Sequence, residues 1–295
     1  MTSISPPESE EHVDQLLRAA IADQTLELPP LPRIAVEVMR LTSDDPRTDE
    51  ESDAGAAELA GFIQRDVSLA GQVMRVANSA LYARRTPVVT LSQAIAWLGV
   101  REIRNIAYAA AVRGQVFNSA YFHREMAEIW RESVITALFA QEIARLKRRN
   151  VESAYLCGLL HRVGYAVMLS RMGVAALEHR LSIDVTTVSR YAADHEARVG
   201  AHLAANWHLP LSVASAIAHW RNPLEAGHAR TEVMEVALAR QISDELRSPG
   251  VGGELPDSML GPVSRWMDDL SIYPDELFSI MAQRAAIYAT AESFT

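Results

Sequence analysis

The chain has 295 residues, of which 49% are hydrophobic, and a formal net charge of −9. This composition supports a sizeable core and excludes wholesale disorder, and the negative charge repels nucleic acid and anionic membranes. Cys157 is the only cysteine, which excludes an internal disulfide and a thiolate zinc cluster. No apolar run approaches the roughly 18 residues of a membrane span, and the acidic N-terminus has no signal core. We therefore expect a cytoplasmic protein without a membrane partner.

Apolar residues recur at helical spacing along nearly the whole chain, beginning with an amphipathic stretch at 11–22. The prolines of LPPLP, residues 28–32, force an extended segment. Thr90 and Gln93 match a capping box that opens the next helix, and Gly99 offers a stop. Alternating strand patterns are absent, so the predicted fold class is all-α, with two helical lobes that divide near residue 120. The predicted helices are 11–22, 34–41, 56–64, 69–77, 91–98, 103–112, 126–146, 154–172, 188–207, 211–220, 231–247, 259–269 and 274–292.

Histidines and carboxylates form a first group of candidate site residues. His161-Arg162 interrupts the apolar stretch LCGLLHRVGYAVML, Glu132 lies in the helix before it, and His195 and His219 follow in later helices. A divalent metal inside a helical protein would take imidazole and carboxylate ligands from several helices in this way. No pair has the HExxH form, however, and scattered histidines are commonly hydrogen-bonded structural residues. Spacing alone leaves both interpretations open.

Two basic stretches, Arg101–Arg104 and Arg145–Arg149, form a second group with the charge to contact phosphate. The second stretch closes a predicted helix, where cations also complement the helix dipole. Residues 63–78 loosely match two short helices around a turn, as in DNA readers, but lack a basic recognition helix. The sequence also lacks a Walker-type glycine loop and a nucleophile elbow. Nucleic acid is therefore not an expected partner.

Several segments of the chain are similar to a known family. The N-terminal segments LPPLPRIAVEVM, RDVSLAGQVMRVANSALYA and TLSQAIAWLGVREIRNIAYA resemble the first lobe of HDOD domains, the HD-related output domains of bacterial signalling proteins. The segments IWRESVITALFAQEIAR, AYLCGLLHRVGYAVML and HEARVGAHLAANWHLPLSVASAIAHW resemble the second lobe, which is related to HD and HD-GYP phosphohydrolases. The more specific positions, to which the resemblance assigns structural roles, are Asn78, Ser79, Tyr82, Trp207 and Pro210.

The resemblance implies three parts of the chain. An acidic segment with an amphipathic helix occupies 1–24, an HDOD-like domain occupies 26–222, and a C-terminal helical extension occupies 223–295. The domain divides into an N-terminal lobe at about 26–120 and an HD-like lobe at about 121–222.

The metal ligands that the resemblance implies are degenerate in this chain. Where HD-type enzymes have a His-Ser pair, a His-Asp pair and a later aspartate, this sequence has Glu132-Ser133, His161-Arg162 and Ala239. Arginine offers five donors, has no acceptor and stays charged, so it removes a metal ligand and adds repulsion. We therefore expect no metal, no cofactor and no catalytic residue. The opposite charges of Glu132 and Arg162 predict an ion pair in the place of the metal; the alternative is that Arg162 extends to solvent.

The sequence thus predicts a pseudoenzyme that regulates bacterial signal transduction through protein–protein interaction with other signalling proteins. A homo-oligomer is compatible with this prediction. The degenerate pocket would consist of Glu132, His161, Arg162, His195 and His219. Two alternatives remain open: a cryptic metal-dependent phosphohydrolase or phosphodiesterase, and a pocket that senses an anion or nucleotide through Arg162 and the histidines.

Overall fold

The computed structural model describes residues 27–33, 35–36, 51–180, 183–247 and 266–295. Over these ranges every regular element is a helix, which confirms the all-α prediction. The predicted helix at 11–22 lies outside the described residues, as does most of those at 34–41 and 259–269. The helices are α3 (Glu51–Gln64), α4 (Val67–Ala77), α5 (Leu91–Val116), α6 (His123–Leu146), α7 (Val151–Leu160), α8 (Val163–His179), α9 (Val185–Asn206), α10 (Leu211–His219), the short 3-10 turns η1 (Pro223–Glu225) and η2 (Gly227–Ala229), α11 (Arg230–Arg247), α13 (Pro274–Ala282) and α14 (Arg284–Glu292).

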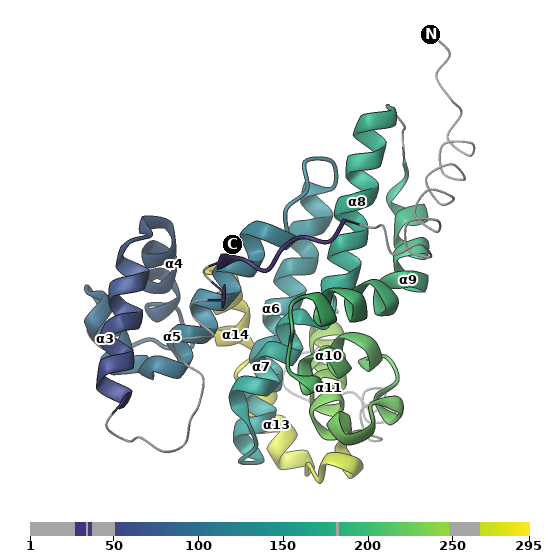
Figure 1. Cartoon of the computed structure of the whole chain (residues 1–295). Coiled ribbons are helices and arrows are strands. Elements are labelled where there is room, and N and C mark those ends of the chain that lie inside the picture. Colours follow the sequence, from purple (N-terminus) through teal and green to yellow (C-terminus); the bar gives the residue numbers. More distant parts are fainter. Residues whose placement is uncertain (1–26, 34, 37–50, 181–182, 248–265) are drawn as a thin grey trace.

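The helices form two lobes joined by α5 (Figure 1). In the first lobe α5 packs with α3 and α4, and it also contacts α7 and α8 of the second lobe. Within α5, Gly99 has a φ of 80°, a backbone conformation that glycine adopts without strain, and the helix kinks there. The central helix α6 is buried along most of its length because α7, α11, α13 and α14 all pack against it. The C-terminal helix α14 therefore belongs to the core of the second lobe.

Two helices that the apolar spacing predicts as continuous are broken in the structure. The predicted helix at 154–172 ends at Leu160 and resumes at Val163, with Arg162 (φ −109°, ψ 17°) at the start of the second half. The predicted helix at 274–292 divides at Gln283 into α13 and α14. Conversely, the helix predicted to stop at Gly99 continues beyond it as the kinked α5. Apolar spacing misses these breaks because both halves keep an apolar face toward the same core.

Asn78 ends α4 and fastens the loop that follows. Its amide group donates to the carbonyl oxygen of Val88 at 2.9 Å and accepts from the Val88 N–H at 2.7 Å. The Ser79 hydroxyl accepts from Thr290 of α14 at 3.0 Å, and the Tyr82 hydroxyl donates to a carboxylate of α5. These hydrogen bonds stabilise the loop and connect the first lobe to α14, so the three side chains have a structural role.

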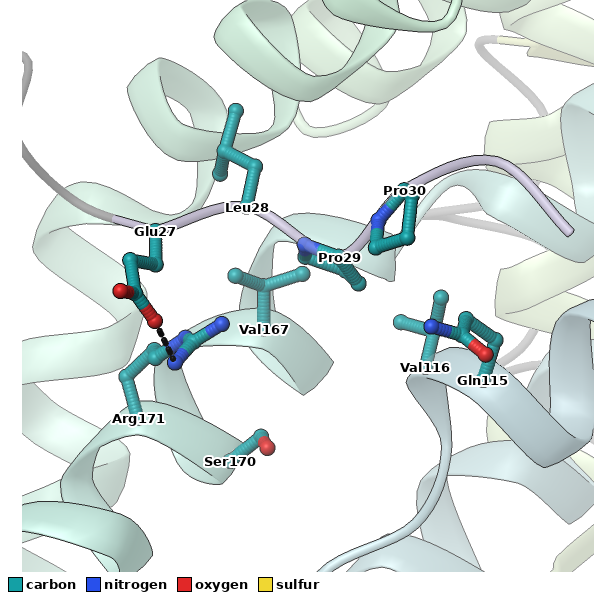
Figure 2. A pocket seen from close by; sticks show the side chains of 9 residues that line it. All are labelled: Glu27, Leu28, Pro29, Pro30, Gln115, Val116, Val167, Ser170 and Arg171. Atoms are coloured by element: carbon teal, nitrogen blue, oxygen red, sulfur yellow. Dashed lines mark hydrogen bonds and ion pairs between the residues drawn. The ribbon is translucent and has the colours of Figure 1, made fainter.

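The extended segment that begins at Glu27 lies against the second lobe (Figure 1). Together with α5 and α8, residues 27–30 line a cavity of about 420 Å³ (Figure 2). Glu27 forms an ion pair with Arg171 at 3.2 Å. The buried indole of Trp207 donates to the carbonyl oxygen of Pro29 at 2.9 Å. An extended proline-rich strand makes no internal hydrogen bonds, so its carbonyl groups are free to bind such donors.

We expect Trp207→Phe to lower the free energy of unfolding by about 1 kcal/mol, because a net hydrogen bond contributes about 0.5–1.5 kcal/mol. Urea denaturation measures the difference. Trp220→Phe is the matched control, since the Trp220 indole N–H is buried with no acceptor among the described residues. Equal losses in the two variants would contradict a stabilising role for the Trp207–Pro29 bond.

Candidate ionic site

Glu132 lies at the centre of an ionic cluster between α6 and α11. Its side chain is buried, with 9% of the residue exposed. Oε2 accepts hydrogen bonds from Arg162 at 3.0 Å and from Arg240 at 2.7 Å, and Oε1 lies 2.6 Å from Nη2 of Arg247. The ion pair between Glu132 and Arg162 is therefore present, and two arginines from α11 join it.

The two additional arginines lie on one face of α11. Positions 240, 244 and 247 are spaced by four and three residues, which places their side chains along the same helical face. Asp244 lies between them, with Oδ1 2.6 Å from Arg240 and 4.0 Å from Arg247. From the sequence, only Ala239 of this helix was expected near the site, and neither arginine was predicted there. The spacing Arg-x3-Asp-x2-Arg was the available signal, although it does not reveal which acidic residue the arginines contact.

The positive charges around Glu132 keep it ionised. Burial raises the pKa of this carboxyl group, but the guanidinium groups of Arg240, Arg247 and Arg162 outweigh that effect and hold the pKa below its usual value. Three guanidinium groups face the carboxylates of Glu132 and Asp244, so the cluster carries excess positive charge. It ties together α6, α11 and the junction between α7 and α8.

This lowered pKa predicts an acid-sensitive contribution to stability. A carboxyl group whose pKa is depressed by folding stabilises the protein above its unfolded pKa, and the contribution disappears as the pH falls through the folded pKa. We therefore expect the difference in unfolding free energy between wild type and Glu132→Gln to be largest above about pH 5. It should decrease as the pH falls below about 4. Urea denaturation across this range measures the difference. For Glu128→Gln, at an exposed position of α6, the difference in unfolding free energy from wild type should not change with pH. A difference for Glu132→Gln that also does not change with pH would contradict the lowered pKa of Glu132.

His161 is a neutral, fully buried imidazole beside this cluster. Burial and the charges of Arg240, Arg162 and Arg221 hold its pKa well below the usual value, against a smaller opposite effect from its backbone hydrogen bond. Because a carbonyl oxygen can only accept, Nδ1 carries the proton and donates to Gly158 at 2.6 Å. Its Nε2 is then an unprotonated acceptor, and no donor reaches it within the described part of the chain.

The side chains around His161 do not fit a divalent cation. The unprotonated Nε2 is a suitable ligand atom, but both carboxylate oxygens of Glu132 are engaged by guanidinium groups. Arg162 adds positive charge where an HD-type site would have a carboxylate. Across the described residues, no group of three or more His, Cys, Asp or Glu side chains could hold a metal ion.

Two residues of the predicted pocket, His195 and His219, lie on α9 and α10. Among the described residues, no hydrogen bond or ion pair joins His195 or His219 to Glu132 or Arg162. His219 instead lies with Nδ1 3.9 Å from Glu225, and 36% of its side chain is exposed. That His195 and His219 share one pocket with the ionic cluster therefore stays a prediction.

A second ion pair, between a buried glutamate and a half-exposed arginine, lies next to the aromatic neighbour of His161. Glu196 is buried in α9 and accepts from Nε of Arg221 at 2.6 Å. The Arg221 guanidinium lies 4.4 Å above the ring of Trp220, whose edge meets the His161 ring at a centroid distance of 5.1 Å. His161 is thus enclosed by cations and an aromatic ring on several sides.

Comparison with solved structures shows the same fold elsewhere. A protein of Shewanella amazonensis SB2B, provisionally named a metal-dependent phosphohydrolase, is 20% identical, with a TM-score of 0.71 over 97% of this chain and 99% of its own. An HDOD domain protein of unknown function from Geobacter sulfurreducens is 21% identical, with a TM-score of 0.66 over 98% and 99%. A Marinobacter aquaeolei VT8 protein, provisionally named a signal transduction protein, is 24% identical, with a TM-score of 0.66 over 97% and 66%. At these identities the likeness establishes the fold alone.

Sequence comparison gives the family. An uncharacterized protein of Treponema pallidum (strain Nichols) is 27% identical over 254 residues, which are 83% of this chain and 47% of that protein. The chain thus spans about half the length of this curated relative. The family model of the HDOD domain matches residues 28–223, nearly the whole range of the resemblance. The chain belongs to the HDOD domain family.

Proposed function

We propose that this chain is a non-catalytic regulatory protein of bacterial signal transduction that acts through contacts with other proteins. The observation that carries the proposal is the ionic cluster: Glu132 binds three arginines. Two members of this cluster, Glu132 and Arg162, stand at positions that the resemblance matches to metal ligands of HD-type enzymes. In this arrangement both oxygens of the carboxylate are taken up by guanidinium groups, so Glu132 has no free oxygen with which to bind a metal that would activate a water. Membership of the HDOD family supports a signalling role.

The first lobe carries apolar side chains that support a role in protein contacts. Val89 and Trp97 are 74% and 45% exposed. The Val89 N–H donates to Gln93, and Trp97 follows one helical turn later, so the two apolar groups lie at the same end of α5. The Trp97 ring is held in place by Arg84, 4.1 Å above it. We call Val89, Gln93 and Trp97 the α5 surface.

No helix in the described ranges is long and apolar enough to cross a membrane.

Metal content and turnover test the non-catalytic part of the proposal. The purified chain is incubated with Mn²⁺, Fe²⁺ and Mg²⁺, desalted and measured by elemental mass spectrometry, and bis(4-nitrophenyl) phosphate serves as the phosphodiester substrate. We expect metal far below one ion per chain and no turnover. One or two retained ions together with metal-dependent turnover would instead establish the phosphohydrolase alternative.

Cross-linking and affinity capture in bacterial lysate test the protein-contact part. We expect a defined partner to be retained by the wild-type chain and lost with Val89→Asp. Leu177→Asp introduces the same charge at a position of α8 that is 55% exposed, and it should retain the partner. Retention of the same proteins by both variants would show that the α5 surface is not the contact.

A second candidate function, the sensing of an anion at the ionic cluster itself, rests on one observation. The Nε atoms of Arg162 and Arg240 are buried donors with no acceptor among the described residues. A small anion would supply acceptors and balance the excess charge. Sulfate or acetate that raises the melting temperature of wild type but not of Arg240→Gln would favour this candidate.

A further inference from the structure

Two adjoining cavities lie where α5 of the first lobe meets the starts of α7 and α10 of the second. Their volumes are about 350 Å³ and 360 Å³, and they share Asn105, Asn150 and Glu152 as lining residues. Each volume is within the range of small-molecule sites. We propose that this junction cavity binds a small organic phosphate of the size of a nucleoside monophosphate. The proposal is independent of the ionic cluster and of the proposed function.

The basic residues of the two stretches singled out in the sequence come together at this cavity. Arg101 and Arg104 line it from α5, and Arg149 lines it from the turn before α7, where its guanidinium group also binds Glu235 of α11 at 2.9 Å. The planar guanidinium group presents parallel N–H donors that can bind two oxygens of one phosphate group at once. Nothing in the local sequence predicted this convergence, because α5 and the turn before α7 are more than thirty residues apart.

Two carboxylates of the protein, those of Glu102 and Glu152, also line the cavities. Glu152 forms an ion pair with Arg104, and its other oxygen lies 3.2 Å from Nε of Arg101. These contacts show that the two arginines are arranged to bind an oxyanion. A phosphate group would therefore compete with Glu152 for them, and the carboxylate would limit the affinity.

Two helices also direct their N-terminal ends at the cavity. The first N–H groups of any helix lack an acceptor within the helix and carry partial positive charge, which suits anions. In α7, the Asn150 side chain accepts only one of them, from Ser153 at 2.9 Å. In α10, which begins after Pro210, no side chain caps the N-terminus. The hydroxyl groups of Ser153 and Ser212, one from each helix, lie 2.9 Å apart at this place.

An unpaired buried hydroxyl group independently marks the cavity as a binding site. Tyr108 lines the cavity near α10, is 2% exposed, and its hydroxyl has no hydrogen-bond partner among the described residues. Burial raises the pKa of this phenol well above its usual value, so the group remains a neutral donor. A buried polar group without a partner is unfavourable, and a ligand oxygen would remove that cost.

The remaining lining fits the organic part of the ligand. Leu156, Pro210 and Val213 supply an apolar wall, and the amide side chains of Asn105 and Asn150 offer donors and acceptors together. A heteroaromatic ring presents both an apolar face and hydrogen-bonding edges. Inorganic phosphate alone would leave this part of the cavity without a contact.

Isothermal titration calorimetry of the full chain tests the proposal with AMP, GMP, CMP and UMP as probes, and with inorganic phosphate and adenosine as partial ligands. We expect at least one nucleotide to bind measurably and both partial ligands to bind at least about tenfold more weakly. Glu152→Gln should tighten nucleotide binding about tenfold because it removes the competing carboxylate, and Arg104→Gln should weaken it by a similar factor. Arg101 is mostly exposed, so Arg101→Gln replaces Arg104→Gln if that variant does not fold.

Arg230→Gln is the matched control, because Arg230 pairs with Asp269 and lines neither cavity. It should bind the nucleotide as wild type does. The proposal is overturned if no nucleotide binds to wild type or to Glu152→Gln at millimolar concentration. It is also overturned if inorganic phosphate binds as tightly as the nucleotides. The same holds if Arg104→Gln, or Arg101→Gln in its place, loses no more affinity than Arg230→Gln.

Discussion

Glu132→Ala is expected to lower the free energy of unfolding by about 3–5 kcal/mol, the usual cost of removing one partner from a buried ionic group. The change leaves Arg162, Arg240 and Arg247 close together without the carboxylate that they share. Asp244 then remains as the neighbouring acid, and it already contacts Arg240 and Arg247. Urea denaturation at neutral pH measures the loss.

The arginine variants should be milder than the glutamate variant. In Arg162→Ala the carboxylate of Glu132 keeps two guanidinium partners, so we expect a loss of about 1–2 kcal/mol. If Glu132 were paired with Arg162 alone, Arg162→Ala would leave the buried carboxylate without any cation, and the loss of stability would be larger. The double variant Glu132→Ala/Arg162→Ala should lose less than the sum of the single losses, because it removes one of the three repelling cations.

Glu128→Ala is the control for this double-mutant cycle, because Glu128 is exposed on the same helix. It should change stability by no more than about 0.5 kcal/mol. Simple additivity of the Glu132 and Arg162 losses would show that the two side chains do not interact. A loss for Arg162→Ala as large as that for Glu132→Ala would show that Arg240 and Arg247 do not share the carboxylate.

Gly164→Ala is expected to destabilise the protein by about 3 kcal/mol, at the upper end of the range for overpacked cores. Gly164 lies near the start of α8, where α9 approaches closely. A Cβ atom there would lie 2.0 Å from the carbonyl oxygen of Glu196 and 2.8 Å from the backbone nitrogen of Gly200. Backbone atoms cannot rotate aside, so α8 and α9 would have to separate.

Gly71→Ala is expected to stabilise the protein, in contrast to Gly164→Ala. Gly71 is an exposed position inside α4, and a Cβ atom there would meet nothing within 4 Å. Since glycine costs about 0.5–1 kcal/mol relative to alanine inside a helix, this variant should be more stable than wild type. Thermal and urea denaturation of both variants measure the two effects. A mild loss for Gly164→Ala would mean that the α8–α9 contact is looser than the structure has it.

The contact between Gly164 and α9 also bears on the surroundings of His161. Glu196, whose carbonyl oxygen meets Gly164, holds Arg221 through its side chain. Displacement of α9 would therefore move the second ion pair away from His161. We expect the imidazole resonances of His161 to shift in NMR spectra of Gly164→Ala, provided that the variant folds.

The local features of this chain could be predicted from the sequence because each depends on nearby residues. Apolar spacing located nearly every helix of the described ranges, and Thr90 caps α5 by accepting from Gln93 as expected. The reciprocal bond of the capping box differs, since Gln93 accepts from Val89 and not from Thr90. The replacement of the aspartate of a His-Asp pair by Arg162 was likewise visible in the sequence, and it predicted the ion pair with Glu132.

The tertiary structure alone decided which charges meet. Arg240 and Arg247 contact Glu132 from more than a hundred positions away, and Arg104 pairs with Glu152 of α7 at the junction cavity. Coulomb interactions select partners by distance in space, and that distance follows from how helices pack, which helical periodicity does not encode. The sequence by itself thus determined the helices and the pairing of Glu132 with Arg162. Packing determined the three-arginine cluster and the junction cavity, because each requires groups from helices that only the folded core brings together.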